Sequence, residues 1–482
     1  MVSEPHVDMS AHSHDKMMFA DHQRTLWAHF ASIALGAWLV TSPFAFGLFD
    51  GSQLFDPAIL RVTAERGLTP PEWRNAALGW SDIASGLLIM IFGALSLWPR
   101  TSWAQWANTF VGLWLLFAPL ILWAPSPAAY SNDLLVGILV ITFAVLVPMM
   151  PGMSMAGMMN PKVVPPGWSY SPSTWAQRLP IAALGLVGLI ISRHLTAYQL
   201  GHIDAAWDPF FAGRPGLNGT ETVITSDMSR AWPIPDAGLG AVAYAMEILM
   251  AVMGGRARWR TMPWMVTFFG ILVVPLGVVS AYFIIIQPIV IGTWSTPALI
   301  AGLAMLVMIP FALDELVAMG QFLLWSRRVG KPLLKTFLMG DAMAGGSEAE
   351  ADDLRSARAA GRDMARGVTL PWTLLVSIAL GIVLMFTRVL WGAGGAMANS
   401  DHVVGALVVT TATIAAAEVA RPLRFINALL GAWLVAAPWL LGGAGPFASS
   451  AGVVIGIALI LLSLPRGRRS HEHYASWDRY VV

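Results

Sequence analysis

The sequence GAWLVTSP at residues 36–43 returns almost unchanged as GAWLVAAP at residues 431–438, and a related copy, GLWLLFAP, occupies residues 112–119. The copies share the frame Gly-x-Trp-Leu-x-x-x-Pro, and matches at identical spacing inside apolar runs indicate an internal repeat. A second frame, Asp-x-x-x-Gly, occurs at Asp82/Gly86, Asp133/Gly137 and Asp401/Gly405. Each acid follows Ser or Asn, so we predict that these acids open helices.

The two frames together predict a two-helix hairpin in a membrane. Glycine lets two helix backbones approach closely in lipid, and tryptophan anchors a helix near the headgroups. Proline marks the outer end of such a helix. This pattern favours a packing scaffold, and nothing in it indicates chemistry.

Composition places the whole chain in a membrane. Of its 482 residues, 56% are hydrophobic and only 12% are charged, which is typical of an all-α polytopic membrane protein. The net charge of +1 gives no reason to expect a nucleic-acid partner. The chain has no cysteine, which excludes a disulfide, a thiolate metal site and a nucleophilic thiol.

Apolar runs of about 20 residues predict about 12 transmembrane helices. We place them at residues 26–48, 80–98, 104–124, 132–150, 176–200, 236–254, 262–287, 293–325, 370–391, 402–420, 424–442 and 448–465.

Basic residues fall in alternate connections between these spans. Arg256, Arg258 and Arg260 lie in one such connection, and 327–335 is another. The short connections of the opposite set contain no Lys or Arg; they are 125–131, 288–293, 392–401 and 443–450. Because basic residues stay on the cytoplasmic side, we predict that both termini are cytoplasmic.

The hairpins resemble the SPW repeat, a two-helix membrane unit named for Ser-Pro-Trp. The resemblance covers about 26–150 and 402–465, with 370–391 as a degenerate first helix. The triplet itself reads Ser42-Pro43-Phe44, Ala118-Pro119-Leu120 and Ala437-Pro438-Trp439.

The middle of the chain has a different pattern. In GTETVITSDMSRAWPIPDAGLGA, residues 219–241, a specific loop frame is formed by Val223, Ser226, Ser229, Ile234 and Pro235. Together with residues 192–211 and 283–301, it resembles a Cys-poor branch of the bacterial vitamin K epoxide reductase (VKOR)-like proteins. The similarity covers about 176–328. It implies a four-helix bundle around a quinone, capped by a helix-bearing loop, in the bacterial inner (cytoplasmic) membrane.

The resemblance also assigns site residues. The redox Cys-x-x-Cys of the family falls on Ser295 and Ala298, and one loop cysteine falls on Thr220. The implied cofactor is a quinone, either ubiquinone or menaquinone. Its headgroup would lie near Ser295 and Ala298, with further contacts from Ser226, Ser229, His194 and Tyr198.

Several functions remain open at this level. A serine hydroxyl is not redox-active and alanine has no functional group, so the family mechanism is not possible in this chain. We therefore predict a quinone-binding protein that is non-catalytic or accessory; the alternative is a thiol:quinone oxidoreductase whose cysteines were replaced. Its partners would be membrane lipid, the quinone and a membrane or periplasmic protein.

A third possibility is a transporter or a copper-handling protein. The Met-rich segment 149–160 and the tail residues His6, His12, His14 and His22 combine side chains that suit copper(I). A flexible linker explains the same residues, and we assign no metal site. Glu418 beside Arg421, and likewise Asp314 and Glu315, are interpreted as ion pairs near cytoplasmic helix ends.

The predicted domains follow from these patterns. They are a cytoplasmic His- and Met-containing tail at 1–25, two hairpins at 26–150, a Met/Pro-rich linker at 151–175, a four-helix bundle at 176–328, a charged cytoplasmic insert at 329–369, two further hairpins at 370–465 and a cytoplasmic tail at 466–482.

Overall fold

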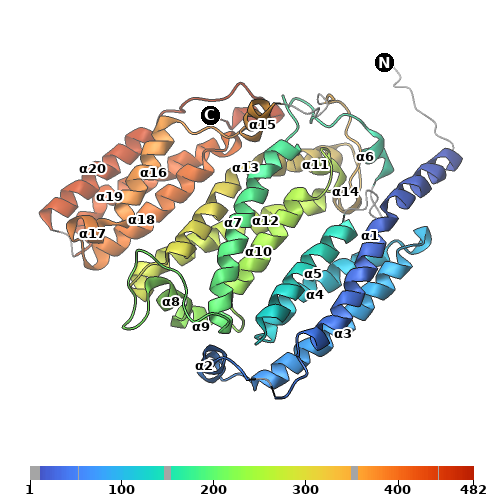
Figure 1. Ribbon diagram of the computed structural model, residues 1–482. Helices are drawn as coiled ribbons and strands as arrows, with labels where there is room; N and C mark the ends of the chain where they lie inside the picture. Colours follow the sequence, from blue (N-terminus) through green and yellow to red (C-terminus); the bar gives the residue numbers. More distant parts are fainter. Residues whose placement is uncertain (1–10, 53, 146–153, 349–355, 443–444, 482) are drawn as a thin grey trace, which may run out of the picture. The chain divides into compact units, whose positions relative to one another are not determined.

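The computed structural model describes residues 11–52, 54–145, 154–348, 356–442 and 445–481 (Figure 1). In these ranges the regular structure is helical and β-pairing is limited to isolated bridges, which confirms the predicted all-α class. Several predicted segments lie partly outside the described residues: the His/Met tail 1–25, the span 132–150, the Met-rich segment 149–160, the linker 151–175, the charged insert 329–369, the connection 443–450 and the tail 466–482.

The helices follow one another through the chain. Those of the first half are α1 (Ala11–Ala45), α2 (Pro57–Arg66), α3 (Pro71–Leu95), η1 (Pro99–Thr101), α4 (Ala104–Ile121), α5 (Pro127–Val145), α6 (Met155–Met159), α7 (Trp175–Leu200), α8 (Gly219–Ile224), α9 (Asp227–Arg230) and α10 (Asp236–Val252). Those of the second half are α11 (Arg258–Thr261), α12 (Pro263–Ile286), η2 (Gln287–Ile291), α13 (Thr296–Arg328), α14 (Leu333–Met339), α15 (Ala357–Met364), α16 (Trp372–Met385), α17 (Thr387–Trp391), α18 (Gly395–Ile414), η3 (Glu418–Leu423), α19 (Arg424–Leu440), α20 (Pro446–Ser463) and η4 (Ala475–Arg479).

Nine helices of the described residues are long and apolar enough to cross a membrane, so the chain is a multi-pass membrane protein but the count of 12 is not confirmed. The three predicted spans that fall short correspond to α10, α16 and α18. Helices α10 and α16 have 17 and 14 residues, fewer than the roughly 20 that span a bilayer. Helix α18 is longer, but its polar segment 399–402 lowers its hydropathy.

The chain divides into two compact units. Unit 1 contains residues up to 153 with the short segments 196–204 and 232–242, and unit 2 contains the remaining residues. In unit 1, α1 packs on α3 and α4 packs on α5, as the repeat predicted. In unit 2, α16 packs on α18 and α19 packs on α20 (Figure 1).

Paired glycines hold each hairpin together. A Cβ atom built on Gly36 would lie 2.6 Å from the carbonyl oxygen of Gly86, and one built on Gly86 would lie 2.6 Å from that of Gly36. The equivalent reciprocal pairs are Gly112/Gly137, Gly381/Gly405 and Gly431/Gly456. The expected close approach of backbones is therefore confirmed in all four hairpins. Gly381 takes the place of the glycine of the first frame and Gly456 that of the second, although the other residues of each frame differ there.

The prediction that the acids of the second frame open helices is wrong. Ser81, Asn132 and Ser400 lie inside α3, α5 and α18, and each accepts a hydrogen bond from a tryptophan indole. Trp38 Nε1 donates to Asn132 Oδ1 at 2.8 Å, and Trp114 Nε1 donates to Ser81 Oγ at 2.9 Å. Trp38 and Trp114 thus each bond the opposite hairpin of unit 1, so these polar residues join two hairpins instead of capping helices.

The glycine pairs give a direct stability test. We expect Gly86→Ala to destabilise unit 1 by about 1–3 kcal/mol, because the new methyl group would overlap the backbone of Gly36. Gly320 is a matched control in the interior of α13, where a new Cβ meets no atom within 4 Å. Gly320→Ala should leave the thermal melting temperature in detergent unchanged or slightly raised. Equal melting curves for both variants would contradict the packing described here.

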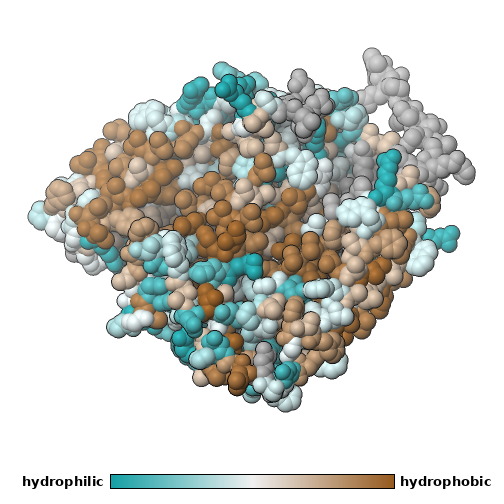
Figure 2. Space-filling view, in the orientation of Figure 1, coloured by the Kyte–Doolittle hydropathy of each residue, from teal (hydrophilic) through white to brown (hydrophobic). Residues whose placement is uncertain are grey.

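The lipid-facing surface of the hairpins in unit 2 is apolar. Figure 2 shows hydrophobic residues over α16 to α20, and the exposed side chains there include Leu375, Trp439, Val454 and Leu461. Exposed large apolar residues on this scale are typical of a surface in contact with lipid.

Helices α12 and α13, together with the parts of α7 and α10 that belong to unit 2, form the bundle predicted for the middle of the chain. The ring of Tyr244 on α10 fills the space over Gly188 on α7, where a Cβ would lie 2.3 Å from the ring. The hydroxyl of Tyr244 donates to the carbonyl of Ala301 on α13 at 2.6 Å. Helix α12 packs along α13. Helix α13 therefore contacts both α10 and α12, and α10 in turn contacts α7.

Polar contacts close one end of this bundle. Arg258 donates from Nε and Nη2 to the two carboxylate oxygens of Glu315, each at 2.6 Å, with both side chains buried. The predicted ion pair of Glu315 is thus confirmed. That of Asp314 is wrong, because Asp314 accepts a hydrogen bond from the hydroxyl of Tyr170 at 2.5 Å instead.

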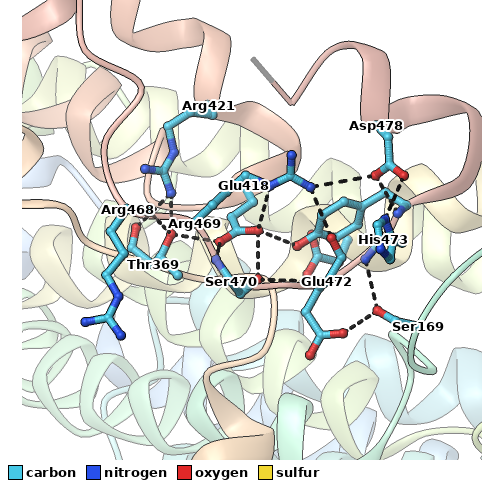
Figure 3. Close-up of polar contacts among 12 residues, drawn as sticks. Ser169, Thr369, Glu418, Arg421, Arg468, Arg469, Ser470, Glu472, His473 and Asp478 are labelled. Atoms are coloured by element: carbon cyan, nitrogen blue, oxygen red, sulfur yellow. Dashed lines mark hydrogen bonds and ion pairs between the residues drawn. The ribbon is translucent and has the colours of Figure 1, made fainter.

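The C-terminal tail packs at the same end through Glu418 (Figure 3). This buried carboxylate accepts from the hydroxyls of Thr369 at 3.0 Å, Ser470 at 2.8 Å and Tyr474 at 3.0 Å. Arg421 donates to the hydroxyl of Thr369, so the predicted direct Glu418–Arg421 pair is replaced by a bridge through that hydroxyl. Burial explains the arrangement, since a buried carboxylate needs several donors.

Candidate functional site

The residues at the Cys-x-x-Cys positions lie where α13 begins. Ser295 is the N-cap residue, and its Oγ accepts a hydrogen bond from the backbone N–H of Ala298 at 3.3 Å. Pro297 occupies the first turn, where its missing N–H costs nothing. Helix α13 therefore starts at Thr296, three residues later than the predicted span, because a serine with this geometry ends the non-helical segment.

The loop between α7 and α10 brings Thr220 to Ser295. The hydroxyl oxygens of the two residues lie 2.9 Å apart, and both residues are completely buried. They are 75 residues apart in sequence. The positions that the resemblance assigned to a loop cysteine and a helix cysteine are thus in direct contact.

Asp208 joins both residues to the start of α13. Its Oδ2 accepts from Thr220 Oγ1 at 2.7 Å and its Oδ1 accepts from Thr296 Oγ1, also at 2.7 Å. The backbone N–H groups of Phe210 and Phe211 donate to Oδ1 at 3.2 and 3.1 Å. One carboxylate therefore fixes its own loop, the loop helix α8 and the first turn of α13.

These donors determine the charge of Asp208. Partial burial alone would raise its pKa, but the hydrogen bonds from Thr296, Thr220 and the N–H groups of Phe210 and Phe211 hold the pKa below its usual value. Asp208 is therefore ionised at neutral pH and only accepts hydrogen bonds.

The ionised carboxylate sets the direction of the hydroxyl chain. Thr220 must give its proton to Asp208, so the proton between Thr220 and Ser295 comes from Ser295. Ser295 Oγ meanwhile accepts from Ala298. Both hydroxyl protons are committed within the cluster, and neither is available to a ligand.

Further contacts hold the loop in place. Asn218 and Glu221 form a capping box at the start of α8, and Glu221 Oε1 also accepts from the N–H of Ala206 at 3.0 Å. A Cβ on Gly219 would lie 2.2 Å from the carbonyl oxygen of Trp294, so only glycine allows this approach. Gln287 Oε1 accepts from the N–H of Ser295 at 2.8 Å.

The other predicted site residues are used locally. Ser226 caps α9 by accepting from the N–H of Ser229, whose own hydroxyl donates to the carbonyl of Ile224 at 2.9 Å. His194 Nε2 accepts from the N–H of Trp207 at 3.2 Å. In the neutral ring this leaves Nδ1 as a donor. Tyr198 is buried and belongs to unit 1, and no contact of it with Ser295 is described.

Asp208 is among the titratable residues that the sequence places near the quinone mouth, but sequence reasoning did not identify its contacts with Thr220 and Thr296, or the part played by Gln287. A weak signal existed for Asp208, since an acid in an otherwise apolar segment, AAWDPFF, requires donors. Nothing in the sequence indicated Gln287, because its contact depends on the π-helical turn that precedes α13.

Comparison with known families agrees with this geometry. Residues 179–313 match the vitamin K epoxide reductase family, and residues 67–147 and 371–465 match the SPW repeat domain. The chain therefore contains one VKOR-like domain and two segments of the SPW repeat domain. Comparison with curated proteins and with solved structures gave no match.

The VKOR-like site has no group that could transfer electrons. Oxygen replaces sulfur at Ser295 and Thr220, and Ala298 carries only a methyl group. Among the described residues, no cluster of three or more His, Asp or Glu side chains forms a metal site. The cluster holds the loop against the start of α13 through hydrogen bonds, and it cannot form a mixed disulfide.

Proposed function

We propose that this VKOR-like protein binds a membrane quinone without thiol chemistry and acts as a non-catalytic or accessory protein. The observation that carries the proposal is the Ser295–Thr220 hydrogen bond of 2.9 Å, which preserves the contact between helix and loop while removing the reactive atoms. We further propose a bacterial inner membrane with both termini in the cytoplasm.

The residues near the start of α13 suit a quinone. A quinone is a neutral, flat ring with two acceptor oxygens and an isoprenoid tail, so it needs small apolar neighbours and few donors. Ala298 is half-buried and small, and Ala301 and Gly302 follow it one turn later. Since the hydroxyls of Ser295 and Thr220 are committed, Nδ1 of His194 is the donor best suited to a ring oxygen.

The binding energy of such a ligand does not depend on thiols. Each methylene group that the tail buries contributes roughly 0.8 kcal/mol, so replacing two sulfur atoms removes catalysis but little affinity. The quinone supplies redox chemistry wherever a reducing partner is present. The residues of this chain would orient its ring and exclude water.

Thermal stabilisation by quinone tests the proposal. Added ubiquinone or menaquinone should raise the melting temperature of the detergent-solubilised protein, because a ligand that binds only the folded state stabilises it. Ala298→Trp should abolish this shift by filling the ring site. Leu303→Trp is the matched control, since Leu303 is 55% exposed on the same helix and should tolerate the added bulk.

The alternatives give different results in this experiment. If neither quinone raises the melting temperature of the unmodified protein, quinone binding is wrong and a structural role is favoured. If Ala298→Trp responds as strongly as Leu303→Trp, a quinone binds elsewhere. A thiol:quinone oxidoreductase with substituted cysteines would require Cys at positions 295 and 298 in the natural sequence.

A further inference from the structure

A cavity of about 240 Å³ in unit 2 is lined in part by Trp294. One wall is the segment that leads into α13, with Thr293 and Trp294. The other wall comes from the ends of the SPW-type helices, with Phe386, Arg388 and His402. The cavity therefore lies between the VKOR-like bundle and the C-terminal hairpins.

Aromatic rings make the inner wall rigid. Trp294 stacks on Phe386 with ring centroids 5.2 Å apart, and it meets the edge of His402 at 4.9 Å. Trp294 and His402 are both buried. Since these three rings support one another, the cavity keeps its shape without a ligand.

The polar side of the cavity is cationic. Arg388 is exposed, and its guanidinium donates to the carbonyl of Pro288 at 3.4 Å and to the side chain of Asn399. Among the described residues, no carboxylate lies within ion-pairing distance of Arg388. A guanidinium next to apolar walls, with no carboxylate partner, favours an anion that also carries apolar groups.

His402 adds a second polar group. It lies close enough to Arg388 for their charges to interact. Its Nδ1 contacts the carbonyl of Met385 at 3.3 Å. Its Nε2 is buried and makes no hydrogen bond by distance and angle, so it is available to a polar group in the cavity.

The rim of the cavity continues onto lipid-facing surface. Val389 and Leu390 follow Arg388 in α17 and are 80% and 56% exposed. An arginine followed directly by exposed aliphatic side chains offers a positive charge next to an apolar surface. An anionic lipid needs both, one for its phosphate and the other for its acyl chains.

We propose that this cavity binds the headgroup of an anionic phospholipid, with the phosphate beside Arg388 and the acyl chains along Val389 and Leu390. A neutral quinone would leave Arg388 without a counter-charge, and a free phosphate ion would leave the apolar rim without a function. The site is separate from the Ser295–Thr220 cluster and does not depend on quinone binding.

Native mass spectrometry of the delipidated full-length protein tests this site. Titration with dihexanoyl phosphatidylglycerol should give one bound lipid, in preference to dihexanoyl phosphatidylcholine. Arg388→Gln should weaken phosphatidylglycerol binding roughly tenfold and abolish the preference, whereas Arg388→Lys should keep most of it. Arg327→Gln, at an exposed arginine of α13, is the control and should bind like the parent.

Three results would overturn the proposal. Unchanged phosphatidylglycerol binding in Arg388→Gln would remove the arginine from the site. Equal affinity for glycerol 3-phosphate would show a site for soluble anions, since the acyl chains would then contribute nothing. Displacement of the lipid by equimolar menaquinone would assign the cavity to a quinone. Arg388→Lys also controls for folding, because it retains the positive charge.

Discussion

Mild oxidation of the variant Thr220→Cys/Ser295→Cys should close a disulfide in nearly every molecule. The two hydroxyl oxygens already lie 2.9 Å apart in a fully buried contact, so sulfur atoms at these positions would meet with little movement of the backbone. The parent chain has no cysteine, so the new pair would contain the only thiols in the protein. Gel shift with a maleimide of high mass measures the fraction that has reacted.

The disulfide should also stabilise the protein. It would close a loop between residues 75 apart in sequence, and the chain-entropy estimate for such a loop is up to about 4 kcal/mol. Ser229→Cys/Ser295→Cys is the control, because Ser229 Oγ donates to the carbonyl of Ile224, and the side chain of Ser295 bonds Thr220 and Ala298 and not Ser229. If Thr220→Cys/Ser295→Cys stays reduced under conditions that oxidise a surface pair, the loop does not lie against α13 as described.

Removing one partner of the buried Arg258–Glu315 pair should be the most destabilising single substitution considered for the bundle. The guanidinium and carboxylate share two hydrogen bonds of 2.6 Å, with side-chain exposures of 0% and 3%. Glu315→Ala would leave a buried cation without its counter-charge, which costs about 3–5 kcal/mol. The melting temperature and the yield of monodisperse protein would both fall.

A partly exposed ion pair in the same unit provides the comparison. Lys331 and Asp341 lie 2.8 Å apart with side-chain exposures of 29% and 27%. Asp341→Ala should cost less than about 1 kcal/mol, because water screens the pair. Combining Arg258→Met with Glu315→Leu should recover much of the stability lost in Glu315→Ala. Similar losses in Glu315→Ala and Asp341→Ala would show that burial does not control the effect.

The repeated hairpins were predictable from sequence because the residues that pack within them recur at fixed spacing in each frame. Gly36 and Gly86 each belong to a frame of fixed spacing, and the same frames place Trp38 and Asn132. The role of Asn132 was misread, since a polar residue before an acid indicates a helix cap and an interhelical partner equally well. Only the structure, in which one hairpin packs on the other, distinguishes a helix cap from an interhelical hydrogen-bond partner.

Family resemblance assigned Thr220 and Ser295 to a loop-cysteine and a helix-cysteine position, and their direct contact could not follow from spacing. The cluster around it was not predicted. Asp208 meets its donors only when the loop folds against Thr296, so its sequence shows that it needs donors but not which ones. Gln287 reaches Ser295 only through the π-helical turn and has no local sequence signal. Residues that a loop brings together are the part that sequence patterns describe least.

Mass spectrometry of the small molecules extracted from the purified protein tests quinone binding most directly. The protein should be prepared in mild detergent from its native membrane, with Ala298→Trp prepared in parallel. We expect an isoprenoid quinone at close to one per chain in the parent and its loss in Ala298→Trp, with no quinone reduced when a dithiol is added. A parent protein without quinone, or equal quinone in both preparations, would contradict the account.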